Sequence, residues 1–101
     1  MGAVHHVVLV QWKDATPPDV REAARDAARS FRGLIPGIVR LDEGPSVSPE
    51  GLEGGYEWGL LISFEDSAAR DAYLPHPTHR VLADLIGAHS SRVVVFDLDA
   101  P

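Results

Sequence analysis

The chain has 101 residues, of which 45% are hydrophobic and 24% charged, a composition typical of one folded domain rather than a disordered segment. Its net charge of −6 and its nine scattered basic residues, eight of them arginine, do not provide the basic surface that nucleic-acid phosphates require. The absence of cysteine excludes disulfides and thiolate metal sites, and no apolar run approaches the roughly 20 residues of a membrane span. We therefore expect a single domain over residues 1–101 that binds neither nucleic acid nor membrane.

The first predicted element is a strand over residues 4–13, which are rich in valine. Apolar side chains occur on both of its faces, a pattern typical of a strand that is covered on both sides. His5 and His6 point to opposite faces, so they cannot both serve one site. The residues before the strand carry neither the charged segment nor the cleavage site of a signal peptide, and we expect a cytoplasmic location.

A helix and two strands are predicted next. Thr16 is the expected N-cap and Pro17 the first helical residue, and the helix is expected to end near Gly33. Its apolar face repeats at three- and four-residue spacing (Val20, Ala23, Ala24, Ala27, Ala28, Phe31, Leu34). Strands are expected over residues 38–43 and 56–64, joined by a Gly-, Pro- and Ser-rich connection that forms either a flexible flap or an irregular hairpin.

The last third of the chain predicts a broken helix and a final strand. One short helix spans residues 68 to 73 or 74, Pro75 ends it, and Pro77 opens a second one that reaches Gly87. The final strand covers residues 92–98. The order β-α-β-β-α-β is that of an α+β, ferredoxin-like subunit with a four-stranded antiparallel sheet and helices on one face. Since the strands are apolar on both faces, we expect a second copy to cover the free face in a homodimer.

The corner between the two short helices is the best candidate active site. Pro75 and Pro77 stiffen the backbone around His76, and His79 falls at the third helical position. The positive end of the helix is expected to lower the pKa of His79, which would keep a neutral imidazole available as a general base. The hydroxyl of Tyr73 is positioned to donate to a carbonyl that becomes an enolate.

Several segments resemble the stress-responsive A/B barrel (Dabb) family of the dimeric α+β barrel superfamily. They are the first strand from His6 to Asp14, residues 55–56, Phe64-Glu65, the stretch Tyr73-Leu74-Pro75-His76-Pro77-Thr78-His79, and Val94 to Asp97. The resemblance implies a dimer whose sheets close into a barrel. Some members are polyketide cyclases of the olivetolic-acid type, which close a β-keto chain by intramolecular aldol condensation without a cofactor. The tyrosine and histidine that carry that chemistry match Tyr73 and His79, and a pocket histidine matches His6.

The resemblance leads us to expect catalysis by His79 and Tyr73, with His6, His76 and Trp58 as candidate substrate-binding residues, no cofactor, and a small apolar, β-keto or aromatic ligand. Other interpretations stay open. Tyr73 and His79 are also consistent with a structural hydrogen bond at the broken helix, His76 with a helix cap, and Trp58 with the core. A metal site from His6, His76 and His79 is disfavoured, because the spacing is not that of a zinc helix. The alternatives to a cyclase are a non-catalytic stress or ligand-binding module and a cofactor-free or haem-using monooxygenase.

Overall fold

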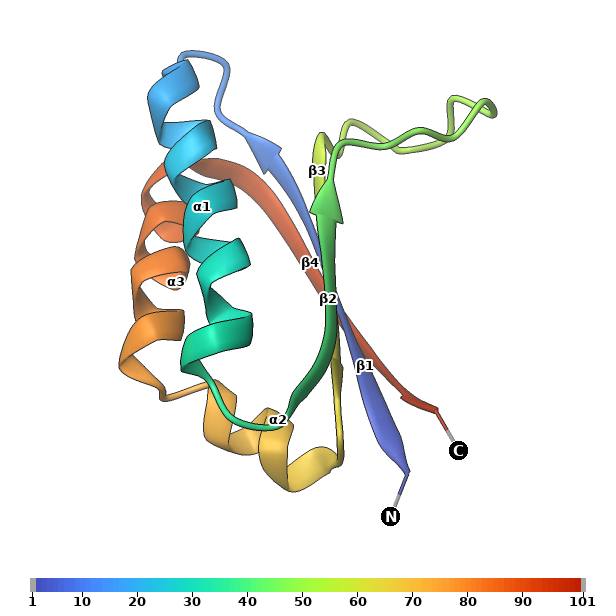
Figure 1. Cartoon of the computed structure of the whole chain (residues 1–101). Helices are drawn as coiled ribbons and strands as arrows, with labels where there is room; N and C mark the ends of the chain where they lie inside the picture. Colours follow the sequence, from blue (N-terminus) through green and yellow to red (C-terminus); the bar gives the residue numbers. More distant parts are fainter. Residues whose placement is uncertain (1, 101) are drawn as a thin grey trace.

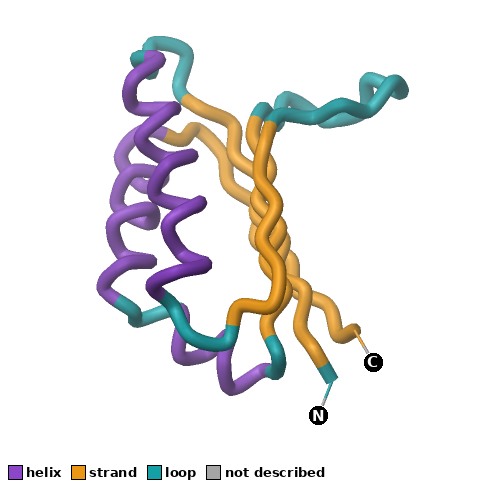
Figure 2. Tube along the Cα trace, in the orientation of Figure 1, coloured by secondary structure: helices purple, strands orange, loops and turns teal. Residues whose placement is uncertain are grey.

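The computed structural model describes residues 2–100, which form one four-stranded antiparallel sheet with three helices on one of its faces (Figures 1 and 2). The strand order is β2-β3-β1-β4. This is the predicted ferredoxin-like arrangement, in which the central strand β1 pairs with β3 on one side and with β4 on the other. The elements are β1 (Ala3–Trp12), α1 (Pro18–Leu34), β2 (Ile38–Gly44), β3 (Trp58–Phe64), α2 (Ser67–Tyr73), α3 (Pro77–His89) and β4 (Ser90–Ala100).

The two faces of the sheet differ in what covers them. In β1 every second residue from Val4 to Trp12 is buried beneath the helices, and the same holds for Trp58, Leu60, Ile62 and Phe64 of β3. The opposite face, which we call the open face, has no helix over it (Figure 1). It still carries large apolar side chains, including Phe96 at 59% exposure and Leu98 at 46%. The sequence pattern that favours a second copy over this face is therefore present in the structure.

Helix α1 begins one residue later than predicted. Pro17 is its N-cap, with an extended backbone and no side-chain capping bond, and Pro18 is the first helical residue. The prediction of Thr16 as N-cap is wrong because a residue that precedes a proline disfavours the helical conformation, which excludes Pro17 itself from the helix. The Thr16 hydroxyl donates instead to the carbonyl of His89 at 3.2 Å. Ala24, Ala28 and Phe31 of α1 are fully buried against the sheet.

A buried carboxylate joins α1 to the sheet. Glu43 of β2, whose side chain is 5% exposed, accepts hydrogen bonds from Arg25 Nε at 2.8 Å, Arg29 Nε at 2.8 Å and Trp58 Nε1 at 2.9 Å. Burial by itself would raise the pKa of Glu43, but the bonds from Arg25, Trp58 and Arg29 outweigh it and lower the pKa below the ordinary value. Glu43 is therefore an ionised anchor between one helix and two strands.

Replacing Glu43 by glutamine is expected to lower the free energy of unfolding at pH 7 by about 2 kcal/mol, because the negative charge is lost and one acceptor oxygen remains for the three donors of Arg25, Arg29 and Trp58. A lowered folded-state pKa means that the stabilisation is present above the unfolded-state pKa of about 4.5 and is lost as the pH falls through the folded-state value. Urea unfolding of both proteins at pH 7 and below pH 4 measures this difference, which should shrink at low pH. An equal difference at both pH values would show that the charge of Glu43 does not contribute.

No helix among residues 2–100 combines the length and the apolar character needed to cross a membrane.

The connection from Pro45 to Glu57, which we call the flap, extends from the end of the sheet toward the side away from the helices (Figure 1). Tyr56, which was predicted to open the third strand, lies in the base of the flap, and the strand begins at Trp58.

Candidate active site

The backbone around Tyr73 and His79 is fixed by local caps. The side chain of Asp66 accepts a hydrogen bond from Ala69 N at 2.8 Å and so starts α2. At the other end of α2, His76 N donates to Tyr73 O at 3.0 Å, and Pro77 opens α3. His79 is thus the third residue of α3, as predicted, and the corner holds it against the end of α2.

Tyr73 lies in a cluster of aromatic rings beneath the helices. Its ring centroid is 4.2 Å from that of His79, 5.0 Å from Phe64, 5.5 Å from His6 and 5.7 Å from Phe31. The residue is 1% exposed. Burial, followed by the negative charge of Asp97, raises the pKa of Tyr73 well above the ordinary value. The phenol therefore stays protonated and can act as a hydrogen-bond donor at any physiological pH.

The hydrogen bond of His79 determines which of its nitrogens is basic. Its Nδ1 lies 2.8 Å from the carbonyl oxygen of Leu74, and since a carbonyl can only accept, Nδ1 carries the proton. In the neutral ring Nε2 then holds a free lone pair. Burial lowers the pKa of His79, against an opposing effect of the Leu74 bond, and repulsion from His6 and His76 in their protonated forms and from Arg80 lowers it further. The pKa of His79 is therefore lowered, as predicted, and burial is the main cause.

His6, Asp97 and Arg70 form a chain of hydrogen bonds in which Asp97 lies between the other two. The Nδ1 of His6 donates to Asp97 Oδ1 at 2.6 Å, and Arg70 Nη1 donates to Asp97 Oδ2 at 2.6 Å. His6 and Asp97 are directly opposite in the β1–β4 register, and both face the helices. Burial would raise the pKa of Asp97, but the bonds from Arg70 and His6 lower it. His5, on the open face, is bonded instead to Ser63 Oγ at 2.8 Å.

Sequence reasoning did not single out Asp97 and Arg70 as members of this cluster. The signal for Asp97 was an acidic residue inside an otherwise apolar strand, which requires a partner when it faces the core. Arg70 gave no signal, because its place in the cluster depends on how α2 packs against the sheet.

His76 and Trp58, the other two predicted substrate-binding residues, do not join the ring cluster as His6 does. His76 is the N-cap of α3, where its Nδ1 accepts from Thr78 N at 3.1 Å. Trp58 stacks on Trp12 with centroids 6.1 Å apart and sits six residues along β3 from Phe64, about 20 Å away. The structure therefore gathers His6, Tyr73 and His79, and it places Trp58 at the far end of the sheet.

Four hollows of about 370, 310, 270 and 170 Å³ are formed by the described residues, and none of these four is lined by Tyr73, His79 or His6. The smallest of the four is lined by Arg70 and Asp97, and Asp97 is hydrogen-bonded to His6. Within residues 2–100 no group of three or more His, Cys, Asp or Glu residues is placed to hold a metal ion.

Comparison with known proteins settles the family. Residues 4–100 match the model of the stress responsive A/B barrel domain, Dabb. The chain belongs to the Dabb family. This Dabb chain is 30% identical over 96 residues to the stress-response A/B barrel domain-containing protein HS1 of Arabidopsis thaliana, covering 95% of this chain and 88% of that protein.

Two further relatives bear on function and assembly. Olivetolic acid cyclase of Cannabis sativa is 23% identical to this Dabb chain over 95 residues, which cover 94% of each protein. A dimeric ferredoxin-like protein of unknown function from Jannaschia sp. CCS1 superposes with a TM-score of 0.88 at 27% identity, covering 98% of this chain and all of that one. The fold is therefore that of proteins described as dimeric, which supports self-association of this Dabb chain.

Proposed function

We propose that the protein is a cofactor-independent enzyme that catalyses aldol-type cyclisation of a small β-keto substrate at the Tyr73–His79 pair. The observation that carries the proposal is the bond from His79 Nδ1 to Leu74 O, because it leaves Nε2 as a free base beside a tyrosine that stays protonated. The similarity to olivetolic acid cyclase over nearly the whole chain supports the same chemistry.

In the proposed reaction, His79 Nε2 takes a proton from a carbon that lies between two carbonyl groups. The carbanion attacks a second carbonyl carbon of the same molecule, so that one carbon–carbon bond forms and the carbonyl electron pair moves to its oxygen. Tyr73 donates a hydrogen bond to the oxygen that gains charge, and the proton held by His79 returns to that oxygen. A positioned base contributes about 10²–10⁴-fold to such a step.

His6 has a supporting role in this proposal. Asp97 accepts from its Nδ1, so Nε2 of His6 points away from the carboxylate, on the side of the sheet where Tyr73 lies. Because Tyr73 is 1% exposed, the substrate reaches the hydroxyl in this proposal only when α2 and residues 74–76 move.

The burial of Tyr73 favours a second candidate function, which is a non-catalytic stress-related or ligand-binding dimer. In that case the rings of His6, Phe31, Phe64, Tyr73 and His79 form a structural cluster, and the corner serves to join two helices. The two candidates differ in turnover, since only the first predicts any.

Incubation of the protein with nonane-2,4,6,8-tetraone and with a linear 3,5,7-trioxo acyl thioester tests the proposal, with cyclic products separated by liquid chromatography and identified by mass. We expect product formation faster than in buffer. The rate should fall as the pH drops through the lowered pKa of His79, below the ordinary imidazole range, and stay level up to at least pH 9 because the pKa of Tyr73 is raised. Product formation at the buffer rate with both compounds would favour the non-catalytic function.

A further inference from the structure

A pair of charged side chains joins α2 to β4 beside the ring cluster. Arg70 Nη1 donates to Asp97 Oδ2 at 2.6 Å, and Asp97 Oδ1 accepts from His6, whose ring lies 5.5 Å from that of Tyr73. Of the side-chain hydrogen bonds formed among residues 2–100, the one between Arg70 and Asp97 connects α2 to the sheet. It does so near the end of the sheet where β1 begins and β4 ends (Figure 1).

The rest of α2 is held by little apolar packing. Tyr73 is its buried residue, and Ala69 is packed against the core while only partly buried. The helix has 7 residues, fewer than the roughly 12–15 that a helix needs to be stable by itself. Segments with few buried apolar contacts open at a small fraction of the global free energy of unfolding. Helix α2 is therefore the element best suited to the movement that the burial of Tyr73 requires.

A hollow of about 170 Å³ lies directly outside the charged pair. Its lining combines residues of α2 with the ends of β1 and β4 (Val4, Ser67, Arg70, Asp97, Leu98 and Asp99). Inward from this hollow come the charged pair, then His6, then the ring of Tyr73. Val4 and Asp99 are paired across β1 and β4, and Val4 is one of the residues of β1 that are buried beneath the helices. The hollow is thus on the helix side, where a second copy on the open face leaves it accessible.

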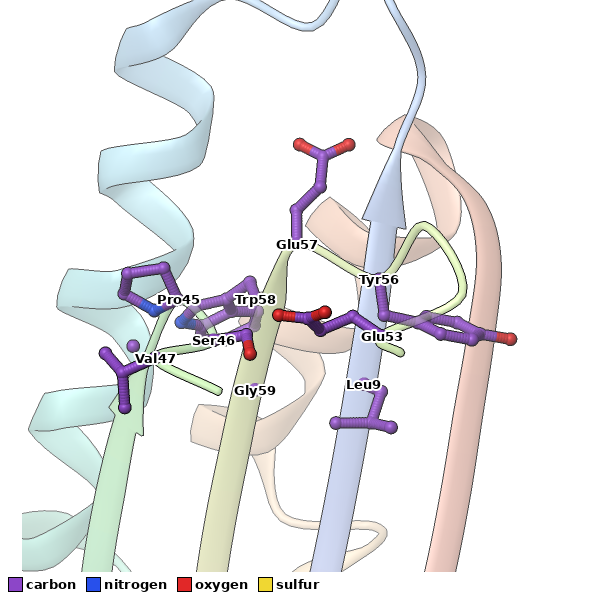
Figure 3. Close-up of a pocket in the computed structure, with 10 residues that line it drawn as sticks. Leu9, Pro45, Ser46, Val47, Glu53, Tyr56, Glu57, Trp58 and Gly59 are labelled. Carbon is purple, nitrogen blue, oxygen red and sulfur yellow. The ribbon is translucent and has the colours of Figure 1, made fainter. Parts of the chain in front are cut away.

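The larger hollows do not lead to the ring cluster. The one of about 370 Å³, at Leu9, Gly59 and the flap, lies on the open face, where a second copy is expected (Figure 3). The one of about 310 Å³ shares Leu9 and Gly59 with it. The one of about 270 Å³ is lined by Trp12 and Trp58, at the far end of the sheet from Tyr73. Of these four hollows among the described residues, the smallest is the one that adjoins the site.

We propose that α2 is a lid over the Tyr73–His79 pair, that the Arg70–Asp97 ion pair is the latch of this lid, and that the adjoining hollow is the entrance for the substrate. The entrance rests on the proposed cyclisation, which supplies the molecule that enters. The latch is a property of the fold, and its opening can be measured without any turnover.

Opening of the latch leaves neither of its charges without a partner. Asp97 keeps the hydrogen bond from His6, and Arg70 keeps Asp71, which belongs to the same helix and accepts from Arg70 Nε at 2.8 Å. Both side chains of the latch are 25% exposed, so water can replace the bond between them. The open state therefore lies close in free energy to the closed one, as repeated opening of a lid requires.

Amide hydrogen exchange of the full-length protein measures the opening of α2 residue by residue. Arg70→Met removes the charge and keeps the stem of the side chain, and we expect the amides of residues 70–73 to exchange about three- to tenfold faster. Arg70→Lys keeps the charge and should restore most of the protection. Arg32→Met is the matched control, because Arg32 is an exposed arginine of α1 that takes part in none of the ion pairs formed among residues 2–100. It should leave the exchange of α2 unchanged.

A larger side chain in the hollow tests the entrance. Ser67→Leu should lower kcat/KM for the carbonyl compound that the protein converts by about three- to tenfold and change kcat by less than about twofold, because entry is hindered while the reacting groups are untouched. Ala68→Leu is the matched control, since Ala68 is an exposed neighbour in the same helix that does not line the hollow. Its kcat and KM should equal those of the unaltered protein.

Three outcomes would overturn the proposal. Unchanged exchange of α2 in Arg70→Met would show that the burial of Tyr73 alone holds the helix. Exchange that accelerates equally in α1, α3 and the sheet would show that Arg70 stabilises the whole fold instead of a lid. Equal kcat/KM for Ser67→Leu and Ala68→Leu would place the entrance elsewhere. Faster exchange of α2 in a protein that converts neither carbonyl compound would remove the proposed function and the entrance, and it would leave the latch in place.

Discussion

Replacing His79 by alanine is expected to reduce the rate of cyclisation by about 10²–10⁴-fold, the contribution of a positioned general base. Tyr73→Phe should reduce it by about 10²–10³-fold, because it removes a donor to the developing oxyanion while it keeps the ring. Both effects are measured as kcat/KM with whichever of the two carbonyl compounds the unaltered protein converts. Retained turnover in both variants would rule out the proposed roles.

The packing around the pair indicates that these variants will still fold. Tyr73→Phe preserves all four ring contacts of the cluster, and His79→Ala removes one ring and one hydrogen bond to Leu74, which is 44% exposed and accessible to water. His89→Ala is a matched control, since it changes the same residue type in the same helix about 15 Å away. Thermal unfolding of all three should stay within several degrees of the unaltered protein. A collapse of folding in Tyr73→Phe would mark the hydroxyl as structural instead.

Replacing Gly37 by alanine is expected to destabilise the protein by about 3 kcal/mol, the second large effect that the structure predicts. Gly37 joins α1 to β2 with a φ of +87°, and a Cβ there would lie 2.5 Å from Ala69 Cβ of α2. A left-handed backbone and a forced shift of a packed helix each cost about 1–2 kcal/mol. The melting temperature of a domain of this size should fall by more than about 10 °C.

Gly33→Ala is the control for that experiment. Gly33 lies in α1, with no atom within 4 Å of a Cβ built there, so alanine should leave the stability unchanged or raise it by up to about 0.5–1 kcal/mol. Equal melting temperatures for the two variants would show that α2 yields to the extra methyl group without cost.

The order and type of the elements followed from sequence because each one has a strong local signal. Valine-rich runs marked β1 and β4, three- and four-residue spacing marked α1, and Pro75 and Pro77 marked the break between α2 and α3. The start of α1 was mistaken because two consecutive prolines moved it, and the start of the third strand because Tyr56 serves the flap. The first error has a local cause that is visible in the sequence, whereas the second depends on the contact of Tyr56 with the distant Arg92.

The candidate site was predictable only in part, for a similar reason. Tyr73 and His79 are only six residues apart, so the two prolines between them were sufficient to indicate that their side chains lie close together. The bond between His6 and Asp97 joins residues 91 positions apart, and Arg70 reaches the same carboxylate through the packing of α2. The pairing of Gly44 with Gly59 on the open face also depends on strand register, although neither glycine has a distinctive sequence context.

The pairing of β1 with β4 also has a consequence for how the chain folds. Strand β1 lies in the middle of the sheet, and its partner along one whole edge, from Ala3↔Ala100 to Trp12↔Ser90, is β4, the last of the four strands to be made. That edge of β1 stays unpaired until β4 has been made, with valine side chains on both faces. Contacts between residues this far apart in sequence slow folding. Until they form, the unpaired edge of β1 can pair with strands of other chains. We therefore expect chains that lack β4 to aggregate, and chains that contain it to be protected once β4 has paired with β1.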